Sequence, residues 1–318
     1  MARIAVTGST GFVGSNISEA LRLAGHDVVG LSRDAARIET PWEIRTVDYS
    51  SLAAISEAMG DVDAIVHCAI ANDFTRLLEN REAGYDAYVG LTDRIATVSV
   101  ERDIHMMYIS TDWVMDGQGH LEPETNPGNA INFYGYLKAL GEQAVRSRTE
   151  GRGTIARIAG VMGRHRLTES PRQQDVGFGY FVDTLVTTLR RGDAFTVWGG
   201  PNVNKVTSPS LASEVGAQLG RVVNRGTTGT LHLVGDDAIG RMELAYATCD
   251  VFELPHELIV EADPPTAELF PAPVPRDSSL GNEATKIALG IEPQSITDIL
   301  TAFREEIDSG SVSPLTRG

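Results

Sequence analysis

The stretch Thr7-Gly-Ser-Thr-Gly-Phe-Val-Gly14 directly follows the strand-like segment Arg3-Ile-Ala-Val6. It predicts a glycine-rich turn between a buried β-strand and an α-helix. In such a turn Gly8 permits the tight bend, Gly11 lets the backbone approach a pyrophosphate, and Gly14 lets the helix pack close to the sheet. The helix N-terminus then offers its N–H groups and positive dipole end to the phosphates. The motif predicts a dinucleotide site, and the alternative is a glycine turn that serves helix packing alone.

The first half of the chain alternates between short apolar segments and longer helical ones. The expected strands lie near 3–7, 27–32, 63–67, 105–110 and 154–158, and the expected helices near 12–24, 51–59, 78–102 and 133–148. This alternation indicates a parallel sheet of right-handed βαβ units. The expected fold class is therefore α/β, a Rossmann-type doubly wound parallel sheet with a smaller C-terminal substrate-binding lobe. Ligands of such sheets bind beyond the carboxyl ends of the strands, where Gly8, Ser32, Cys68, Ser110 and Ile158 fall.

Beyond residue 158 the pattern loosens. We expect a helix near 178–190, a hairpin around Gly199-Gly200-Pro201, a helix near 210–223, a strand at 230–234 that returns to the sheet, and a proline-rich extended connection at 262–276. The predicted organisation is a dinucleotide-binding lobe of residues 1–158 plus about 206–235. A substrate-binding lobe of about 159–205 plus 236–309 follows, with a tail at 310–318.

Composition excludes some classes of partner. The 318 residues carry a formal net charge of −16, which argues against a nucleic-acid surface or an anionic membrane surface. The two cysteines, Cys68 and Cys249, have no metal-type spacing, so a reducing, cytoplasmic compartment is expected. No apolar stretch is long enough to span a bilayer, and because a strand starts within residues 1–7 we expect no signal peptide.

The residues Tyr134-Gly-Tyr-Leu-Lys138 carry the chemistry. Tyr134 and Lys138 are four apart, so on a helix they share one face. A neighbouring ammonium favours the phenolate, which predicts a lowered pKa for Tyr134 and proton exchange with a carbonyl or an alcohol. Upstream, Ser110 and Thr111 end a predicted strand, and either hydroxyl could position a substrate oxygen. Hydride transfer to a ketone needs such a proton donor beside the nicotinamide.

Together these motifs resemble those of an extended short-chain dehydrogenase/reductase, and most closely the dTDP-4-dehydrorhamnose reductase family. The resemblance extends from residue 7 to residue 280 and rests on Thr7–Gly14, Ser110-Thr-Asp-Trp-Val-Met-Asp-Gly117, Tyr134–Lys138 with the following Gly141-Glu142, and Pro275-Arg-Asp-Ser-Ser-Leu280. It implies an active site of Thr111, Tyr134 and Lys138, with Ser110 adjacent. Tyr134 would be the general acid in reduction, Lys138 would lower its pKa and bind the nicotinamide ribose, and Thr111 would orient the carbonyl. The chain departs from the family pattern at Trp113, Met115, Val274 and Gly281, and it lacks an evident Asn within 85–92.

The choice of nicotinamide cofactor depends on the end of the second strand. An acidic side chain there would bind the ribose of NAD, whereas Ser32 and Arg33 can receive a 2′-phosphate. NADP(H) is therefore favoured, with NAD(H) as the alternative. By resemblance, Asp48 contacts the adenine amine and the loop at 68–71 lies against the adenosine. The residues expected to contact the cofactor are Gly8, Thr10, Gly11, Phe12, Val13, Gly14, Ser32, Arg33, Asp48, Tyr49, Cys68, Ala69, Ala71, Tyr134 and Lys138.

Three functions stay open. The leading one is an NADP(H)-dependent ketoreductase that acts on a sugar-like carbonyl, such as a nucleotide-activated 4-keto-6-deoxysugar. A nucleotide-sugar epimerase or dehydratase shares the fold, and a non-catalytic regulatory subunit could retain the cofactor pocket. The expected partner is a small-molecule substrate, a sugar or a nucleotide sugar, and the formation of a homodimer is left open. His67 is predicted to be a satisfied core histidine, and no metal site is expected even though His120, Glu122 and Glu124 lie close in sequence.

Overall fold

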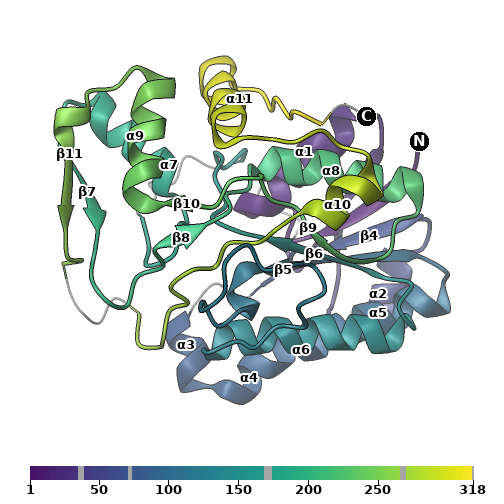
Figure 1. Cartoon of the computed structure of the whole chain (residues 1–318). Helices are drawn as coiled ribbons and strands as arrows, with labels where there is room; N and C mark the ends of the chain where they lie inside the picture. The colour runs from purple at the N-terminus through teal and green to yellow at the C-terminus, as the bar shows by residue number, and fades with distance from the viewer. Residues whose placement is uncertain (35–38, 71–73, 168–173, 266–269, 317–318) are drawn as a thin grey trace.

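A seven-stranded parallel sheet forms the centre of the computed structural model, which describes residues 1–34, 39–70, 74–167, 174–265 and 270–316 (Figure 1). The strand order is β3-β2-β1-β4-β5-β6-β9. The strands are β1 (Arg3–Thr7), β2 (Asp27–Ser32), β3 (Glu43–Thr46), β4 (Ala64–His67), β5 (His105–Thr111), β6 (Thr154–Ile158) and β9 (Gly229–His232). Chain order reverses between β1 and β4, so the carboxyl ends of these strands flank the crevice where ligands of such sheets bind.

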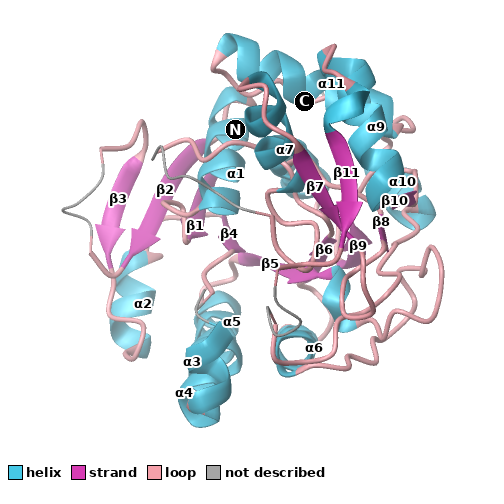
Figure 2. Cartoon of the chain, turned by 90° about the vertical axis from the view of Figure 1, so that its left-hand side faces the viewer, coloured by secondary structure: helices cyan, strands magenta, loops and turns pink. Residues whose placement is uncertain are grey.

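Helices cover both faces of the sheet (Figure 2). One face carries α1 (Phe12–Leu23), α8 (Ala212–Arg225) and α10 (Glu283–Leu289), and the other carries α2 (Leu52–Ala58), α5 (Leu91–Glu101) and α6 (Phe133–Arg148) (Figure 1). Side chains alternate accordingly, since Ile4 and Val6 pack with residues of α1 and α8 whereas Ala5 packs with residues of α2 and α5. Helices α1 and α8 approach so closely that a Cβ at Gly216 would lie 2.8 Å from the Cα of Ile17. The doubly wound α/β fold predicted from the sequence is confirmed.

The region expected to be one helix over 78–102 is divided into four segments. These are α3 (Phe74–Glu79), α4 (Arg81–Tyr85), the π-helix η1 (Asp86–Gly90) and α5. The Asn80 side chain accepts a hydrogen bond from the backbone N–H of Ala83 and so starts α4. The chain also contains an edge strand, β3, that the sequence analysis did not predict, because its residues Glu-Ile-Arg-Thr are largely polar.

The C-terminal lobe is built around α7 (Phe181–Arg190), α9 (Arg241–Phe252) and α11 (Ile296–Ser309), and it lies at the left and top of Figure 1. The predicted hairpin at 199–201 is wrong. Strand β7 (Phe195–Trp198) pairs in parallel with β11 (Ile259–Ala262), which follows α9 and the 3-10 helix η3 (His256–Leu258). Parallel pairing needs a crossover connection, and the chain through α9 supplies it. A second small ladder joins β8 (Val206–Thr207) to β10 (Ile239–Gly240) in antiparallel fashion.

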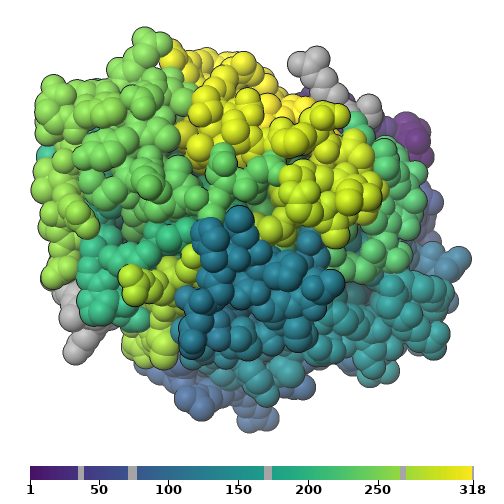
Figure 3. Space-filling view, viewed as in Figure 1, coloured from purple at the N-terminus to yellow at the C-terminus, as the bar shows by residue number. Residues whose placement is uncertain are grey.

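The C-terminal segment returns to the sheet beside the loop that follows β5. This loop begins with the 3-10 helix η2 (Asp112–Val114). The N–H of Glu122 donates to the carbonyl of Ser279 at 2.9 Å, and Figure 3 shows the two segments side by side at the surface. The loop that follows the carboxyl end of β5 is therefore hydrogen-bonded to a segment that is far away in the sequence. In the described part of the chain, no helix is both long enough and apolar enough to cross a membrane.

Candidate active site

The glycine-rich turn between β1 and α1 has the geometry of a phosphate cradle. Gly8 adopts a φ of +68°, and the N–H of Gly11 donates to the Gly8 carbonyl at 2.9 Å. A Cβ at Gly14 would lie only 2.1 Å from the Gly8 carbonyl oxygen. Gly11 is the N-cap of α1, and no side chain caps the helix. The first N–H groups of α1 are thus open to an anionic ligand, which fits the pyrophosphate of a dinucleotide.

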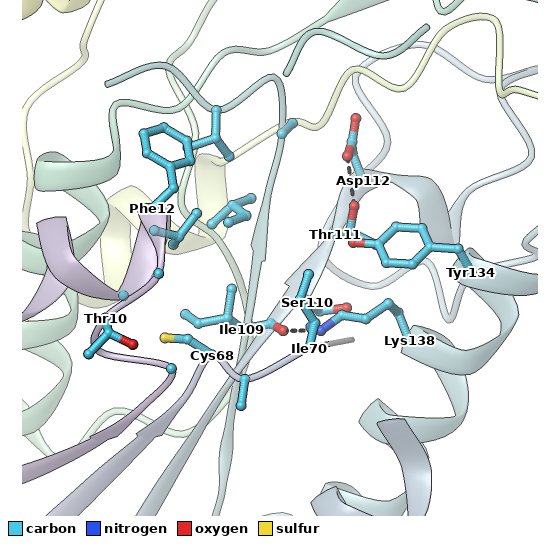
Figure 4. Close-up of a pocket in the computed structure, with 18 of the residues that line it drawn as sticks. Thr10, Phe12, Cys68, Ile70, Ile109, Ser110, Thr111, Asp112, Tyr134 and Lys138 are labelled. Carbon is cyan, nitrogen blue, oxygen red and sulfur yellow. Dashed lines mark hydrogen bonds between the residues drawn. The ribbon is translucent and has the colours of Figure 1, made fainter. Parts of the chain in front are cut away.

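A cavity of about 410 Å³ extends from this turn along the carboxyl edge of the sheet. Figure 4 shows Thr10 and Phe12 on one side of it and Tyr134 and Lys138 on the other. Fourteen of the sequence-predicted site residues line it: Gly8, Thr10, Gly11, Phe12, Val13, Gly14, Ser32, Arg33, Tyr49, Cys68, Ala69, Thr111, Tyr134 and Lys138. Ser110 also lines it, although its hydroxyl points elsewhere. Ala71 lies outside the described residues.

The predicted adenosine end continues into an adjoining cavity of about 560 Å³, which shares Arg33, Tyr49 and Ala69 with the first. Asp48 lines this second cavity, not the first. The Tyr49 hydroxyl donates to the Leu31 carbonyl at 2.9 Å, so it braces the end of β2. Arg94, which sequence reasoning missed, also lines the second cavity and donates to the Tyr49 carbonyl at 2.8 Å.

Behind the glycine turn, a buried hydrogen-bond chain starts at Thr7. The Thr7 hydroxyl oxygen accepts from the N–H groups of Cys68 and Ala69, both at 3.1 Å, and lies 2.7 Å from His67 Nδ1. Since these N–H groups occupy its acceptor sites, the hydroxyl donates to Nδ1. His67 Nε2 then donates to Thr92 at 3.2 Å. Burial lowers the pKa of His67 to about 3, and the residue is a neutral, satisfied core histidine as the sequence predicted.

Ser110 and Thr111 end β5 and point to opposite sides, as successive strand residues do. The Ser110 hydroxyl donates to Glu142 Oε1 at 2.6 Å. Glu142 is fully buried and forms an ion pair with Arg157 at 2.8 Å. The prediction that placed Ser110 beside the substrate is therefore not supported, because its hydroxyl faces the buried ion pair. Thr111 faces the cavity, and Figure 4 shows its side chain next to the Tyr134 hydroxyl. The two side chains are hydrogen-bonded.

Lys138 lies beneath Tyr134 on the next turn of α6. Its Nζ donates to the Ile109 carbonyl at 2.5 Å and lies 4.3 Å from the centre of the Tyr108 ring. Burial lowers the pKa of Lys138 to about 7. The pKa of Tyr134 is raised by burial, although its hydrogen bond with Thr111 opposes this. The expected lowering of the Tyr134 pKa is thus not observed in the protein alone, and Tyr134 is a protonated phenol at neutral pH.

Asp112 is a buried carboxyl group that sequence reasoning did not single out. Its Oδ1 accepts from the Thr111 hydroxyl at 3.0 Å (Figure 4), and its Oδ2 accepts from the Ser278 hydroxyl. Burial raises the pKa of Asp112 to about 6, although both hydrogen bonds oppose this shift. The signal that could have identified Asp112 was its position directly after Thr111, in a motif at the end of a predicted strand.

A third cavity, of about 370 Å³, opens on the far side of Thr111 and Tyr134. Much of its wall is aromatic, and one amide also lines it; these residues are Phe12, Trp113, Tyr134, Phe178, Tyr180, Trp198, Phe270 and Gln174. Two carboxylates, those of Asp112 and Asp175, line it as well. Trp113 connects two of these rings, with its centroid 6.0 Å from that of Tyr134 and 5.4 Å from that of Phe270. Thr111, Asp112 and Tyr134 line this cavity as well as the first, so they stand where the two meet.

Several polar residues outside these cavities have partners elsewhere. Arg166 forms an ion pair with Glu306 at 2.6 Å and donates to Asn16 on α1 at 2.9 Å. His120 lies 2.8 Å from Asp277, Glu122 accepts from Asn126, and Glu124 accepts from Thr285. No group of three or more His, Cys, Asp or Glu side chains within the described ranges is arranged to hold a metal ion.

Comparison with known proteins shows the family of the chain. The family model of the RmlD substrate binding domain matches residues 2–308. A probable low-salt glycan biosynthesis reductase of Haloferax volcanii is 28% identical over 94% of this chain and 96% of its own length. A dTDP-4-keto-6-deoxy-D-glucose reductase of Streptomyces niveus is 26% identical over 87% of this chain and 84% of its own.

Among solved structures, a dTDP-4-dehydrorhamnose reductase from Bacillus anthracis, determined in complex with NADP, has a TM-score of 0.76. It covers 96% of this chain and 99% of its own at 18% identity, which shows a shared fold. The family model likewise matches almost the entire sequence. The chain therefore belongs to the RmlD substrate binding domain family and is an NAD(P)-dependent oxidoreductase of the short-chain dehydrogenase/reductase type.

Proposed function

We propose that the chain is an NADP(H)-dependent ketoreductase whose substrate is a nucleotide-activated 4-keto-6-deoxysugar. One observation carries the proposal. The hydroxyls of Thr111 and Tyr134 lie where the cavity above the glycine turn meets the aromatic cavity. A nicotinamide in the first cavity and a sugar carbonyl in the second would meet beside these two hydroxyls. This is the arrangement that hydride transfer to a ketone requires.

The cofactor would be held by the backbone at one end and by side chains at the other. The open N–H groups at the start of α1 would bind the pyrophosphate, and Ser32 and Arg33 would receive the 2′-phosphate. Lys138 would reach the nicotinamide ribose by exchanging its bond to the Ile109 carbonyl. When bound, the reduced nicotinamide supplies the hydride.

Tyr134 would act as the general acid. Burial keeps it protonated, so a proton is available for the carbonyl oxygen at neutral pH. Thr111, on the adjacent strand end, would orient that oxygen through its hydroxyl. The rings of Trp113 and Tyr88 pack edge-on against Tyr134 at centroid distances of 6.0 Å each and hold it in place.

The aromatic cavity supports the assignment of the substrate. Trp113, Trp198 and Phe270 offer flat faces that suit the apolar face of a sugar ring or a nucleobase. Asp175, exposed to solvent in this cavity, could accept a hydrogen bond from a sugar hydroxyl. Of the two relatives named above, one is a probable glycan biosynthesis reductase and the other is a dTDP-4-keto-6-deoxy-D-glucose reductase. Their names support a nucleotide-activated sugar as the substrate.

The test is a substrate panel followed by NADPH oxidation at 340 nm. The dTDP-, UDP- and GDP-linked 4-keto-6-deoxysugars are compared with free keto sugars, and calorimetry measures NADPH and NADH binding in parallel. We expect turnover with at least one nucleotide-linked sugar and little with the free sugars. NADPH binding without turnover on any compound would instead support a regulatory subunit, and tightly retained NAD in the purified protein would support an epimerase.

A further inference from the structure

The side chains behind Tyr134 form a connected chain that leads away from the cleft. It runs from Tyr134 on α6 through Thr111 at the end of β5 to Asp112 in η2, and then to Ser278 in the C-terminal segment. Building on the proposed function, we infer that Asp112 resupplies the proton that Tyr134 gives to the substrate, through the hydroxyl of Thr111. Asp112 is thus a positioning residue that acts through Thr111, and a proton reserve for the reaction.

The Thr111 hydroxyl is the junction of this chain. It lies 3.0 Å from Asp112 Oδ1, accepts from the N–H of Trp113 at 3.3 Å and also hydrogen-bonds Tyr134. A threonine hydroxyl has a single hydrogen, so it cannot donate to Asp112 and to Tyr134 at the same time. When Asp112 is ionised, the hydrogen points to the carboxylate. When Asp112 is protonated, the carboxyl donates to Thr111 and the hydrogen is free to point to Tyr134.

The transfer balances in two proton shifts. In the reduction, the carbonyl carbon receives the hydride and the carbonyl oxygen receives the proton of Tyr134. The resulting phenolate of Tyr134 then takes the hydrogen of the Thr111 hydroxyl. The Thr111 oxygen then takes the proton of the Asp112 carboxyl group. The net result is a neutral Tyr134, an ionised Asp112 and a protonated product alcohol. Asp112 regains its proton from water after the product leaves the cleft.

The surroundings of Asp112 suit this role. Only 6% of the residue is exposed, and burial favours its protonated form. The opposing groups are the hydroxyls of Ser278 and Thr111 and the N–H of Trp113, which stabilise the carboxylate. Tyr134 on α6 and Asp175 before α7 are the titratable neighbours on the cleft side of Thr111. Ser278 is itself fixed, because it accepts from Asn204 Nδ2 at 2.8 Å and is fully buried.

Lys138 does not occupy this position. Its ammonium group donates to the Ile109 carbonyl, on the opposite side of Tyr134 from Asp112 (Figure 4). Thr111, not Lys138, hydrogen-bonds the Tyr134 hydroxyl on the side that faces Asp112. A proton route through Asp112 is short and preformed in the folded chain.

The test is the pH dependence of kcat for NADPH oxidation with an accepted ketone. The wild-type kcat should fall as pH rises through the pKa of Asp112, because the reaction needs the protonated carboxyl. Ser278→Ala removes a hydrogen bond that stabilises the carboxylate, so this pKa should rise and activity should persist to higher pH. Asp112→Asn keeps the shape but carries no transferable proton, so kcat should fall at least about tenfold and lose this pH dependence.

Ser279→Ala is the matched control, since Ser279 is the equally buried next residue and bonds Asp277 at 2.6 Å instead of Asp112. It should keep the wild-type profile. An unchanged pKa in Ser278→Ala, or a wild-type profile in Asp112→Asn, would overturn the inference while the reductase assignment stands. Absence of NADPH oxidation by the wild-type protein on every substrate would reject the proposed function and this inference together.

Discussion

The two ends of the cleft are built in different ways. The cofactor end is made largely of backbone, and its main part is one contiguous stretch from Gly8 to Gly14. The substrate end is made of side chains from separate segments, represented by Trp113, Tyr180, Trp198 and Phe270. A contiguous stretch can be recognised from spacing alone, whereas a wall assembled from distant segments is visible only after folding. Cofactor binding is therefore predictable from this sequence, and the substrate is not.

The residues at the meeting point should show the largest effect. Tyr134→Phe removes the proton donor but keeps the ring packed between Trp113 and Tyr88, so we expect turnover to fall about 10²- to 10⁴-fold with NADPH affinity unchanged. Steady-state kinetics and calorimetry measure the two quantities. Tyr136→Phe, on the same helix but 54% exposed, is the control. Near-normal turnover in Tyr134→Phe would remove the reductase mechanism.

The cofactor end should be sensitive to a single added side chain. In Gly14→Val the new Cβ would lie 2.1 Å from the Gly8 carbonyl oxygen and 2.7 Å from its carbon, so the turn must shift. We expect NADPH affinity to fall at least about 100-fold through lost phosphate hydrogen bonds. Gly220→Ala is the control, because the nearest atom to its new Cβ is 3.5 Å away. Unchanged affinity in Gly14→Val would mean that the cofactor does not use this turn.

A side chain at the cofactor end should distinguish NADPH from NADH. Arg33→Ala removes a charge-assisted hydrogen bond to the 2′-phosphate, which should weaken NADPH binding about 10- to 150-fold and leave NADH nearly unaffected. Calorimetry with both cofactors measures the difference. Arg191→Ala, which alters an exposed arginine beyond α7, controls for the loss of general positive charge. Equal losses for the two cofactors would mean that Arg33 only packs against the adenine.

A substitution in the aromatic cavity should have the smallest effect on activity, because several rings share the contact with the substrate. Trp198→Leu should raise the KM for the sugar substrate about 2- to 12-fold, the contribution of one aromatic contact, without changing NADPH affinity. Tyr246→Leu, an exposed ring on α9, is the control. If Trp198→Leu weakened NADPH instead, the assignment of the two cavities to cofactor and substrate would be wrong.

Sequence reasoning recovered the doubly wound sheet because apolar strands and glycine turns are local signals. It missed β3, where Arg3 and Arg45 pair with Glu43 along a polar edge. It also missed the π-helix η1, since a single extra residue per turn leaves no clear mark on apolar periodicity. It did not decide whether Ser110 or Thr111 positions the substrate oxygen. The direction of each hydroxyl depends on Glu142, which lies behind the strand and accepts the hydrogen bond of Ser110.

Asp112 and the wrongly predicted hairpin at 199–201 show that contacts between residues far apart in the sequence are also not predictable from local patterns. The environment of Asp112 depends on Ser278, which is 166 residues away in sequence. The pairing of β7 depends on β11, which only forms after α9 has crossed over. Local spacing carries no information on either contact. The roles assigned to Thr111, Tyr134 and Lys138 remain predictions that the variants above can test.

The close packing of α1 against α8 has a consequence for biosynthesis. The helix that presents the phosphate cradle is made first, but its partner spans Ala212–Arg225. At about 5–20 residues per second, the ribosome needs roughly 10–40 seconds to produce the intervening chain. During that interval the part of α1 that packs on α8, which includes Ile17 and Ala20, has no native cover. Stalled nascent chains that end before residue 212 should bind a hydrophobic dye or a chaperone, and chains extended beyond the emergence of α8 should release it.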